Sequence, residues 1–264
     1  MFLADYHTHS VFSHDGKDGI DLMAASARAA GVDELAVTDH CDLISPGKIY
    51  GKYDQRGYFD GLASARAEGK DTPAVLAGLE LGQAHHAPED AEAILSGGGY
   101  DFVLGSVHWL RDGTDFCRYD YSSAEKTREI LDRYFGELLE LAAMPRLFDV
   151  LSHLTLPLRY MPEPDAVDIR LFEPALRRLF KLLADSGRGI EVNTAGGAVE
   201  GTLPDAWCVS LFRECGGEII TVGSDAHVAG DIGRHVKETY ALLRGCGFTR
   251  ITTFRERKPI FIKL

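Results

Sequence analysis

Residues 2–40 read FLADYHTHSVFSHDGKDGIDLMAASARAAGVDELAVTDH and contain one repeat of the alternation that decides the fold. A short apolar run at 2–6 is followed by an amphipathic stretch at 19–30, a glycine at 31 and a second apolar run at 34–37. Short apolar runs are typical of buried strands, and an amphipathic stretch with a glycine just after it is typical of a capped helix. This order predicts a right-handed βαβ unit with parallel strands.

The same alternation continues along the chain. Further strands are predicted at 74–79, 102–107, 148–151, 189–192 and 218–222, with a weaker eighth at 250–254. Helices are predicted at 57–68, 89–95, 123–143, 168–186, 205–215 and 231–244. Seven or eight such units without a Pro/Ser-rich linker predict an α/β barrel, with residues 1–264 forming a single domain.

Composition limits the classes of function. The 264 residues carry a formal net charge of -12 and no run of Lys or Arg, which argues against binding extended nucleic acid and favours a small substrate. The N-terminus has no signal-peptide pattern, and no apolar run is long enough to span a membrane. Five cysteines without C-x-x-C spacing predict neither a disulfide framework nor a thiolate zinc site. We therefore expect a cytoplasmic protein without membrane contact, and the sequence leaves the oligomeric state open.

Metal-binding side chains come directly after most of the predicted strands. These residues are His7, His9, His40, Glu80, His108, His153, Asp225 and His227. One histidine at a strand end is more often a core or capping residue than a ligand, but that explanation fails for six strands together. The carboxyl ends of parallel strands meet at one rim, so we expect these side chains to converge there.

The ligand types indicate a hydrolytic centre. Residues two apart in an extended segment point the same way, so His7 with His9, and Asp225 with His227, can each bind one ion. Imidazole and carboxylate without thiolate suit zinc, manganese or iron. About nine ligands, at roughly three or four per ion with positions left for water, predict two or three ions.

Eight short motifs carry a resemblance to a known family. They are His-Thr-His at 7–9, Ser-His-Asp at 13–15, Thr-Asp-His at 38–40, Gly-Leu-Glu at 78–80, Ser-Val-His at 106–108, Ser-His-Leu at 152–154, Glu-Val-Asn-Thr at 191–194 and Ser-Asp-Ala-His at 224–227. In this order they resemble the polymerase and histidinol phosphatase (PHP) superfamily, and most closely its histidinol-phosphatase branch. The resemblance implies a distorted (β/α)7 barrel, TIM-like, with three divalent metal ions at the C-terminal rim of the strands.

The resemblance also implies roles for single residues. It assigns the first metal to His7, His9, Glu80 and Asp225, the second to Glu80, His108 and His153, and the third to Asp15, His40 and His227. His14, next to Asp15, is an alternative ligand of the third metal. Arg159 matches the arginine with which the family holds phosphate, and the alternative for Arg159 is a surface residue before the turn at Met161.

One position departs from the family pattern. The branch commonly reads Glu-Val-Asn-Thr-Ser-Gly-Leu-Arg, whereas residues 191–198 end in Ala198, where the family has a second phosphate-binding arginine. Alanine cannot replace a guanidinium that grips phosphate at two points. Arg111, Arg118 or Lys48 could supply charge instead, although each is more often a solvated surface residue.

The activity implied by the resemblance is hydrolysis of L-histidinol phosphate to L-histidinol and phosphate, a step of histidine biosynthesis. Direct hydrolysis by water at the metals is expected, with Arg159 stabilising the phosphoryl charge and Asp225 or His227 passing a proton to the leaving group. Ala198 favours an alternative, a PHP phosphoesterase acting on another small phosphate ester or a nucleotide. A metal-binding module without turnover is the third alternative, which the complete ligand set disfavours.

Four other features are expected to lie outside the chemistry. We predict that His85 and His86 form a solvated pair, that His235 lies on the surface and that Cys41 is a small buried residue. The stretch 47–58, rich in Gly and Tyr, is predicted to be a long rim loop that could cover the substrate.

Overall fold

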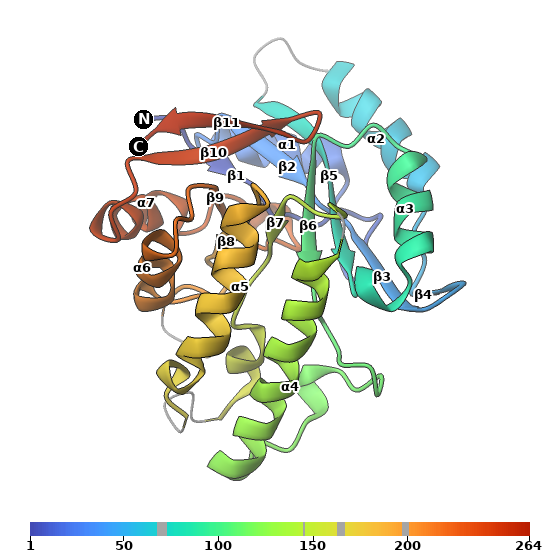
Figure 1. Ribbon diagram of the computed structural model, residues 1–264. Coiled ribbons are helices and arrows are strands. Elements are labelled where there is room, and N and C mark those ends of the chain that lie inside the picture. The colour runs from blue at the N-terminus through green and yellow to red at the C-terminus, as the bar shows by residue number, and fades with distance from the viewer. Residues whose placement is uncertain (68–72, 145, 163–166, 197–200) are drawn as a thin grey trace.

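A computed structural model describes residues 1–67, 73–144, 146–162, 167–196 and 201–264 of the chain (Figure 1). Its central sheet has parallel neighbours in the order β1 (Ala4–Asp5), β2 (Glu34–Val37), β5 (Ala74–Gly82), β6 (Phe102–Ser106), β7 (Val150–Leu151), β8 (Gly189–Asn193) and β9 (Ile220–Gly223). All seven were predicted from the apolar runs. The predicted (β/α)7 architecture is confirmed.

The sheet curls until its two ends meet. The backbone N–H of Tyr6 donates to the carbonyl of Val222 at 2.9 Å, and a parallel bridge joins Thr8 to Ala226. These contacts bring β9 beside β1, so the strands form a nearly closed barrel. The loops after β1 and β9 therefore lie side by side at the same rim.

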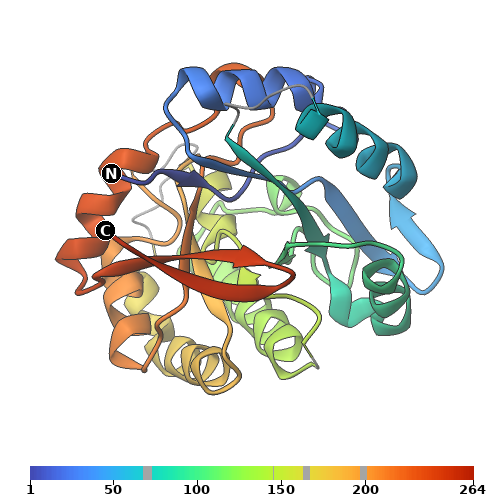
Figure 2. The same ribbon diagram turned by 90° about the horizontal axis from the view of Figure 1, so that it is seen from above.

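In the described ranges seven α-helices are present, and the view from above shows helices around the barrel (Figure 2). They are α1 (Ile20–Ala29), α2 (Gln55–Ala67), α3 (Pro88–Ser96), α4 (Ala124–Ala143), α5 (Glu173–Asp185), α6 (Ala206–Glu214) and α7 (Val236–Gly245). In α5 the buried residues Leu176, Leu179, Phe180 and Leu183 recur at helical spacing, which gives one apolar face to pack on the barrel. No helix in the described ranges is long and apolar enough to cross a membrane.

The stretch predicted as a rim loop is instead mostly regular structure. Strand β3 (His40–Ser45) pairs in parallel with the second half of β5, and β4 (Lys48–Tyr50) pairs antiparallel with β3. Tyr58 lies in α2, fully buried, where its hydroxyl donates to the carbonyl oxygens of Val37 and Gly78. The loop prediction was wrong for most of this stretch, because Gly and Tyr residues also occur in short edge strands and helix starts.

The predicted eighth strand lies outside the barrel sheet. Residues 250–254 belong to β10 (Arg250–Arg255), which forms an antiparallel hairpin with β11 (Lys258–Lys263). Phe254 packs on Phe102 with ring centroids 4.9 Å apart, and its N–H donates to the hydroxyl of Tyr6. Because Phe102 begins β6, the hairpin covers the N-terminal ends of the strands (Figure 2). The opposite, C-terminal rim is left for the functional site.

Candidate metal centre

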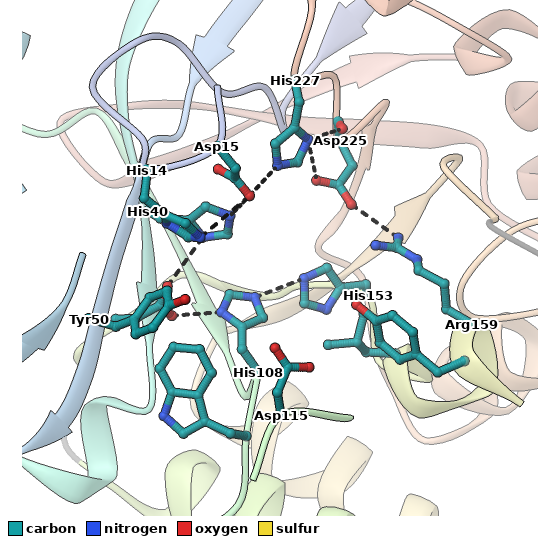
Figure 3. A pocket seen from close by; sticks show the side chains of 14 residues that line it. His14, Asp15, His40, Tyr50, His108, Asp115, His153, Arg159, Asp225 and His227 are labelled. Carbon is teal, nitrogen blue, oxygen red and sulfur yellow. Dashed lines mark hydrogen bonds and ion pairs between the residues drawn. The ribbon is translucent and has the colours of Figure 1, made fainter. Parts of the chain in front are cut away.

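The predicted ligands meet at the C-terminal rim, and Figure 3 shows those of them that line the cavity there. Glu80 lies near the end of β5, and His40 is the first residue of β3, directly opposite it in the parallel register. The remaining ligands follow the ends of other strands or lie in the loop after β1: His7, His9, Asp15, His108, His153, Asp225 and His227. The structure thus brings together all nine side chains that the sequence singled out.

Glu80 lies at the middle of the centre and is fully buried. Its Oε2 atom is 2.9 Å from His40 Nδ1 and 3.1 Å from His7 Nε2. Its Oε1 atom is 2.9 Å from His153 Nε2 and 3.0 Å from His108 Nε2. Each carboxylate oxygen therefore faces a different pair of imidazoles, which is the arrangement that a carboxylate bridging two ions needs.

Asp225 faces the histidines that follow β1. Its Oδ1 atom is 3.3 Å from His9 Nε2 and 3.5 Å from His7 Nε2. Asp225 has a φ of 56°, in the left-handed region that is costly for a residue other than glycine. The N–H of Asp225 donates to the carbonyl of His7 at 2.8 Å, and this bond helps to hold the strained turn. The backbone is thus bent so that the carboxylate faces the other ligands.

The outer edge of the centre contains Asp15. Its Oδ2 atom is 3.2 Å from His227 Nε2 and 3.7 Å from His40 Nε2. His14 Nε2 is 3.6 Å from the same oxygen, so His14 also lies beside the third cluster. Asp15 is 40% exposed at its side chain, which makes this part of the centre the most open to solvent.

Hydrogen bonds behind the centre fix the proton position on several histidines. His7 Nδ1 donates to Glu191 Oε1 at 2.8 Å, and His108 Nδ1 donates to Asp42 Oδ1 at 2.6 Å. A carboxylate only accepts, so each Nδ1 carries a proton, and in the neutral form of either ring the lone pair of Nε2 faces the centre. His227 Nδ1 likewise donates to a backbone carbonyl at 2.9 Å. Such anchoring from behind is typical of metal-binding histidines.

The inward atoms fit metal ions. A lone pair on Nε2 and a carboxylate oxygen about 3 Å away repel each other unless a proton or a metal ion lies between them. Four buried atoms of the centre have no hydrogen-bond partner: His7 Nε2, His9 Nε2, His40 Nδ1 and Glu80 Oε2. The donor set of imidazole nitrogens and carboxylate oxygens suits divalent cations such as zinc, manganese or iron.

The charges in the centre depend on one another. Burial alone would lower the pKa of His7, but the carboxylates of Glu191 and Glu80 outweigh it and raise that pKa well above its usual value. Burial would raise the pKa of Glu80, yet the facing histidines hold it well below its usual value. Burial and the neighbouring His40 lower the pKa of His9 to about 3. The centre therefore keeps ionised carboxylates that require cationic partners.

Close packing behind the ligands requires a glycine at one strand end. A Cβ atom at Gly223 would lie 2.3 Å from the Cβ of His7 and 2.4 Å from Glu191 Oε1. Any larger residue would push this pair apart. The last residue of β9 thus allows His7 and its anchor to approach each other.

A cavity of about 400 Å³ opens over the centre, a size typical of small-ligand sites. Besides the ligands it is lined by Asp42, Tyr50, Trp109, Asp115, Leu156, Arg159 and Tyr160. Arg159 comes from the short helix η3 (Leu156–Tyr160), and its Nη2 donates to Asp225 Oδ2 at 3.0 Å (Figure 3). Its side chain is 19% exposed, so the alternative of a surface residue was wrong.

Arg159 is the only Arg or Lys lining this cavity within the ranges that the structure covers. Arg111 pairs instead with Glu140 at 2.6 Å, and Arg118 and Lys48 are exposed and do not line the cavity. Ala198 lies outside the described residues. Among the described side chains, the permanent positive charge at the wall of this cavity therefore comes from Arg159.

The sequence did not identify the anchoring carboxylates. Glu191 was read only as part of a motif and Asp42 was not singled out, although both are buried and hold ligand histidines from behind. A carboxylate inside an apolar strand, as in Ile190-Glu191-Val192, was the available signal. Cys41 is buried and His235 is exposed, as predicted.

The prediction of a solvated His85–His86 pair was wrong. His85 Nε2 and His86 Nε2 lie 2.9 Å and 2.7 Å from Glu137 Oε2, and only 1% and 4% of the two histidine side chains are exposed. Glu137 comes from α4, and no pattern in the sequence indicated that this helix would cover the two histidines.

Known proteins resemble the chain over nearly its whole length. The probable histidinol-phosphatase of Thermotoga maritima is 29% identical, with 99% of this chain and 100% of that protein aligned. The histidinol-phosphatase of Lactococcus lactis is 26% identical, covering 96% and 95% of the two chains. A crystal structure of the Lactococcus lactis histidinol phosphate phosphatase, complexed with zinc, L-histidinol and phosphate, is 25% identical and superposes with a TM-score of 0.82 over 98% of each chain. Residues 5–195 match the PHP domain family, and the chain therefore belongs to that family, as its motifs predicted.

Proposed function

We propose that the protein is a metal-dependent histidinol-phosphate phosphatase, which hydrolyses L-histidinol phosphate to L-histidinol and phosphate. The observation that carries the proposal is the cluster of nine metal-binding side chains, with Glu80 at its middle, beneath a cavity that also contains Arg159. The full-length likeness to histidinol-phosphatases supports this substrate over other phosphate esters.

The proposed ligand sets are those that the motifs imply, and the close contacts between their members support them. His7, His9, Glu80 and Asp225 would hold one ion, and Glu80 with His108 and His153 a second. Asp15, His40 and His227 would hold a third, and Asp15 is preferred over His14 because its oxygen lies between the two histidines. When bound, such ions activate water and draw negative charge from phosphoryl oxygens.

Three side chains of the protein would act on the substrate: Arg159 would orient it, and Asp225 or His227 would transfer a proton to its leaving group. The guanidinium of Arg159 can donate to phosphoryl oxygens while one of its nitrogens stays on Asp225, which fixes the direction of the donor. Asp225 and His227 lie on the same loop at the cavity wall, and one of them would pass a proton to the leaving oxygen of the ester. Tyr50 and Trp109, whose ring centroids are 5.1 Å apart, form an aromatic surface in the cavity for the organic part of a small ester.

Hydrolysis of candidate esters by the purified protein tests this function. The protein, supplied with zinc or manganese, is assayed against L-histidinol phosphate, mononucleotides and a simple aryl phosphate. We expect the highest kcat/KM with L-histidinol phosphate. Preference for nucleotides would favour the other PHP phosphoesterase activity that Ala198 suggests, and metal-loaded protein without any hydrolysis would indicate a binding module.

A further inference from the structure

A second group of metal-binding side chains lies outside the centre. It consists of His85 and His86, in the short helix η1 (Ala84–His86) after β5, and Glu137, in the middle of α4. The side chains are only 1%, 4% and 10% exposed, respectively. None of the three lines the cavity over the centre.

The three side chains converge on one atom. His85 Nε2 is 2.9 Å and His86 Nε2 is 2.7 Å from Glu137 Oε2. The other oxygen of Glu137, Oε1, accepts the backbone N–H of Arg111 at 2.7 Å. This bond turns Oε2 toward the two imidazoles, whose ring centroids are 4.4 Å apart. The group is therefore held in a shape that presents two nitrogens and one oxygen to the same point.

The protonation of the group also suits a cation. Burial raises the pKa of Glu137, but hydrogen bonds from the two histidines outweigh it and lower that pKa to about 2, so the carboxylate is ionised at neutral pH. Burial lowers the pKa of His85, which favours its neutral form. The buried Nδ1 atom of His85 has no hydrogen-bond partner. In the tautomer that carries the ring proton on Nδ1, no existing bond of Nδ1 is lost and the lone pair of Nε2 is free to bind a cation.

We propose that His85, His86 and Glu137 form a zinc site separate from the centre at Glu80. Two imidazoles and one carboxylate make up a known set of zinc ligands, in which water completes the coordination. Bonds of about 2.0–2.2 Å in a tetrahedron separate ligand atoms by roughly 3.3 Å. The observed 2.7 Å and 2.9 Å therefore need to open by about half an ångström, which small χ rotations of Glu137 provide.

An ion at this site would have a structural role. It would join the end of β5 to α4, two elements that the chain places far apart. Between Glu80 and His85 lies Gln83, whose Oε1 accepts the backbone N–H of His108 at 2.9 Å. The zinc site would thus fix the segment that leads from the bridging carboxylate to the neighbouring ligand loop.

Zinc content per chain tests the proposal. Wild-type protein and the variants Glu137→Gln, His86→Gln and His235→Gln are loaded with zinc, passed over a desalting column and analysed by mass spectrometry of the metal. The exposed His235 is the matched control. We expect Glu137→Gln and His86→Gln to retain one zinc ion fewer than the wild type, and His235→Gln to retain the full number.

Equal zinc content in all four folded proteins would overturn the proposal. His85, His86 and Glu137 would then be a hydrogen-bonded cluster that binds no metal. Hydrolysis of the phosphate ester is measured in parallel. Activity in a variant shows that the nine ligands of the centre, which the substitutions leave in place, still form the metal centre. If neither Glu137→Gln nor His86→Gln folds, an anomalous difference map of wild-type crystals, recorded at the zinc absorption edge, tests the site instead. A peak between His85, His86 and Glu137 supports the site, and its absence in a map that shows ions elsewhere refutes it.

Discussion

Replacing Glu80 with glutamine removes the bridging charge of the centre and keeps the size of the side chain. In the present structure the two Glu80 oxygens lie 2.9–3.1 Å from nitrogens of four histidines, and the side chain is fully buried. An amide offers one neutral oxygen and one NH₂ group, so it cannot hold an ion on each side. The Glu80→Gln variant should therefore bind less metal than the wild type.

The expected loss follows from the burial of Glu80. Removing one partner of a buried charge pair costs about 3–5 kcal/mol. With about 1.4 kcal/mol for each factor of ten, metal affinity should fall by about two to three and a half orders of magnitude. Because hydrolysis depends on the bound ions, kcat/KM should fall by at least about 100-fold.

Metal content after desalting and steady-state hydrolysis of L-histidinol phosphate measure both effects. Glu34→Gln is a matched control, because Glu34 is also a buried strand glutamate but lies at the other end of the barrel, beside Arg255 and Tyr6. We expect this control to lose stability while keeping its metal. A Glu80→Gln variant with wild-type metal content and activity would refute the bridging role.

Further perturbations have expected outcomes that follow from the structure. Arg159→Ala should lower kcat/KM about 10- to 150-fold at unchanged metal content, because a hydrogen bond to a charged group contributes about 1.5–3 kcal/mol; unchanged kinetics would contradict this. Glu191→Gln should weaken metal binding about 10- to 100-fold, seen in competition with a chelator, since the carboxylate anchors His7; equal affinity would argue against the anchor. Chelation by EDTA should abolish hydrolysis and lower the melting temperature, and full activity in EDTA would exclude a metal requirement. Acidification should also release the metal, because histidine binds a metal ion only in its neutral form. Gly136→Ala, at an exposed position of α4 with open space around its Cβ, should stabilise the fold by about 1 kcal/mol in urea unfolding, and a loss of stability would contradict the helix position.

The barrel strands could be predicted because each is a short buried run before a polar residue. The hairpin β3–β4 could not, because its strands carry no alternating pattern and β4 is fully exposed. The run at 250–254 looked like an eighth barrel strand, since its composition is that of a buried strand. Only tertiary contacts place it against β11 and over the N-terminal ends of the others.

The candidate ligands could be predicted because they follow strands whose ends meet at one rim. Their anchors could not, because His7 and Glu191 are separated by 184 positions and only the closed barrel brings them together. The same limit applies to His86 and Glu137, 51 positions apart. Adjacent histidines are usually solvated, and nothing local in the sequence indicates the helix that covers this pair.

Anomalous diffraction from crystals grown with manganese or zinc tests the central claim most directly. We predict peaks within about 2.0–2.3 Å of both Glu80 oxygens, with Nε2 of His7 and His9 around one and Nε2 of His108 and His153 around another. Crystals of the active protein that show no anomalous peak at Glu80 would contradict a metal centre built on that residue.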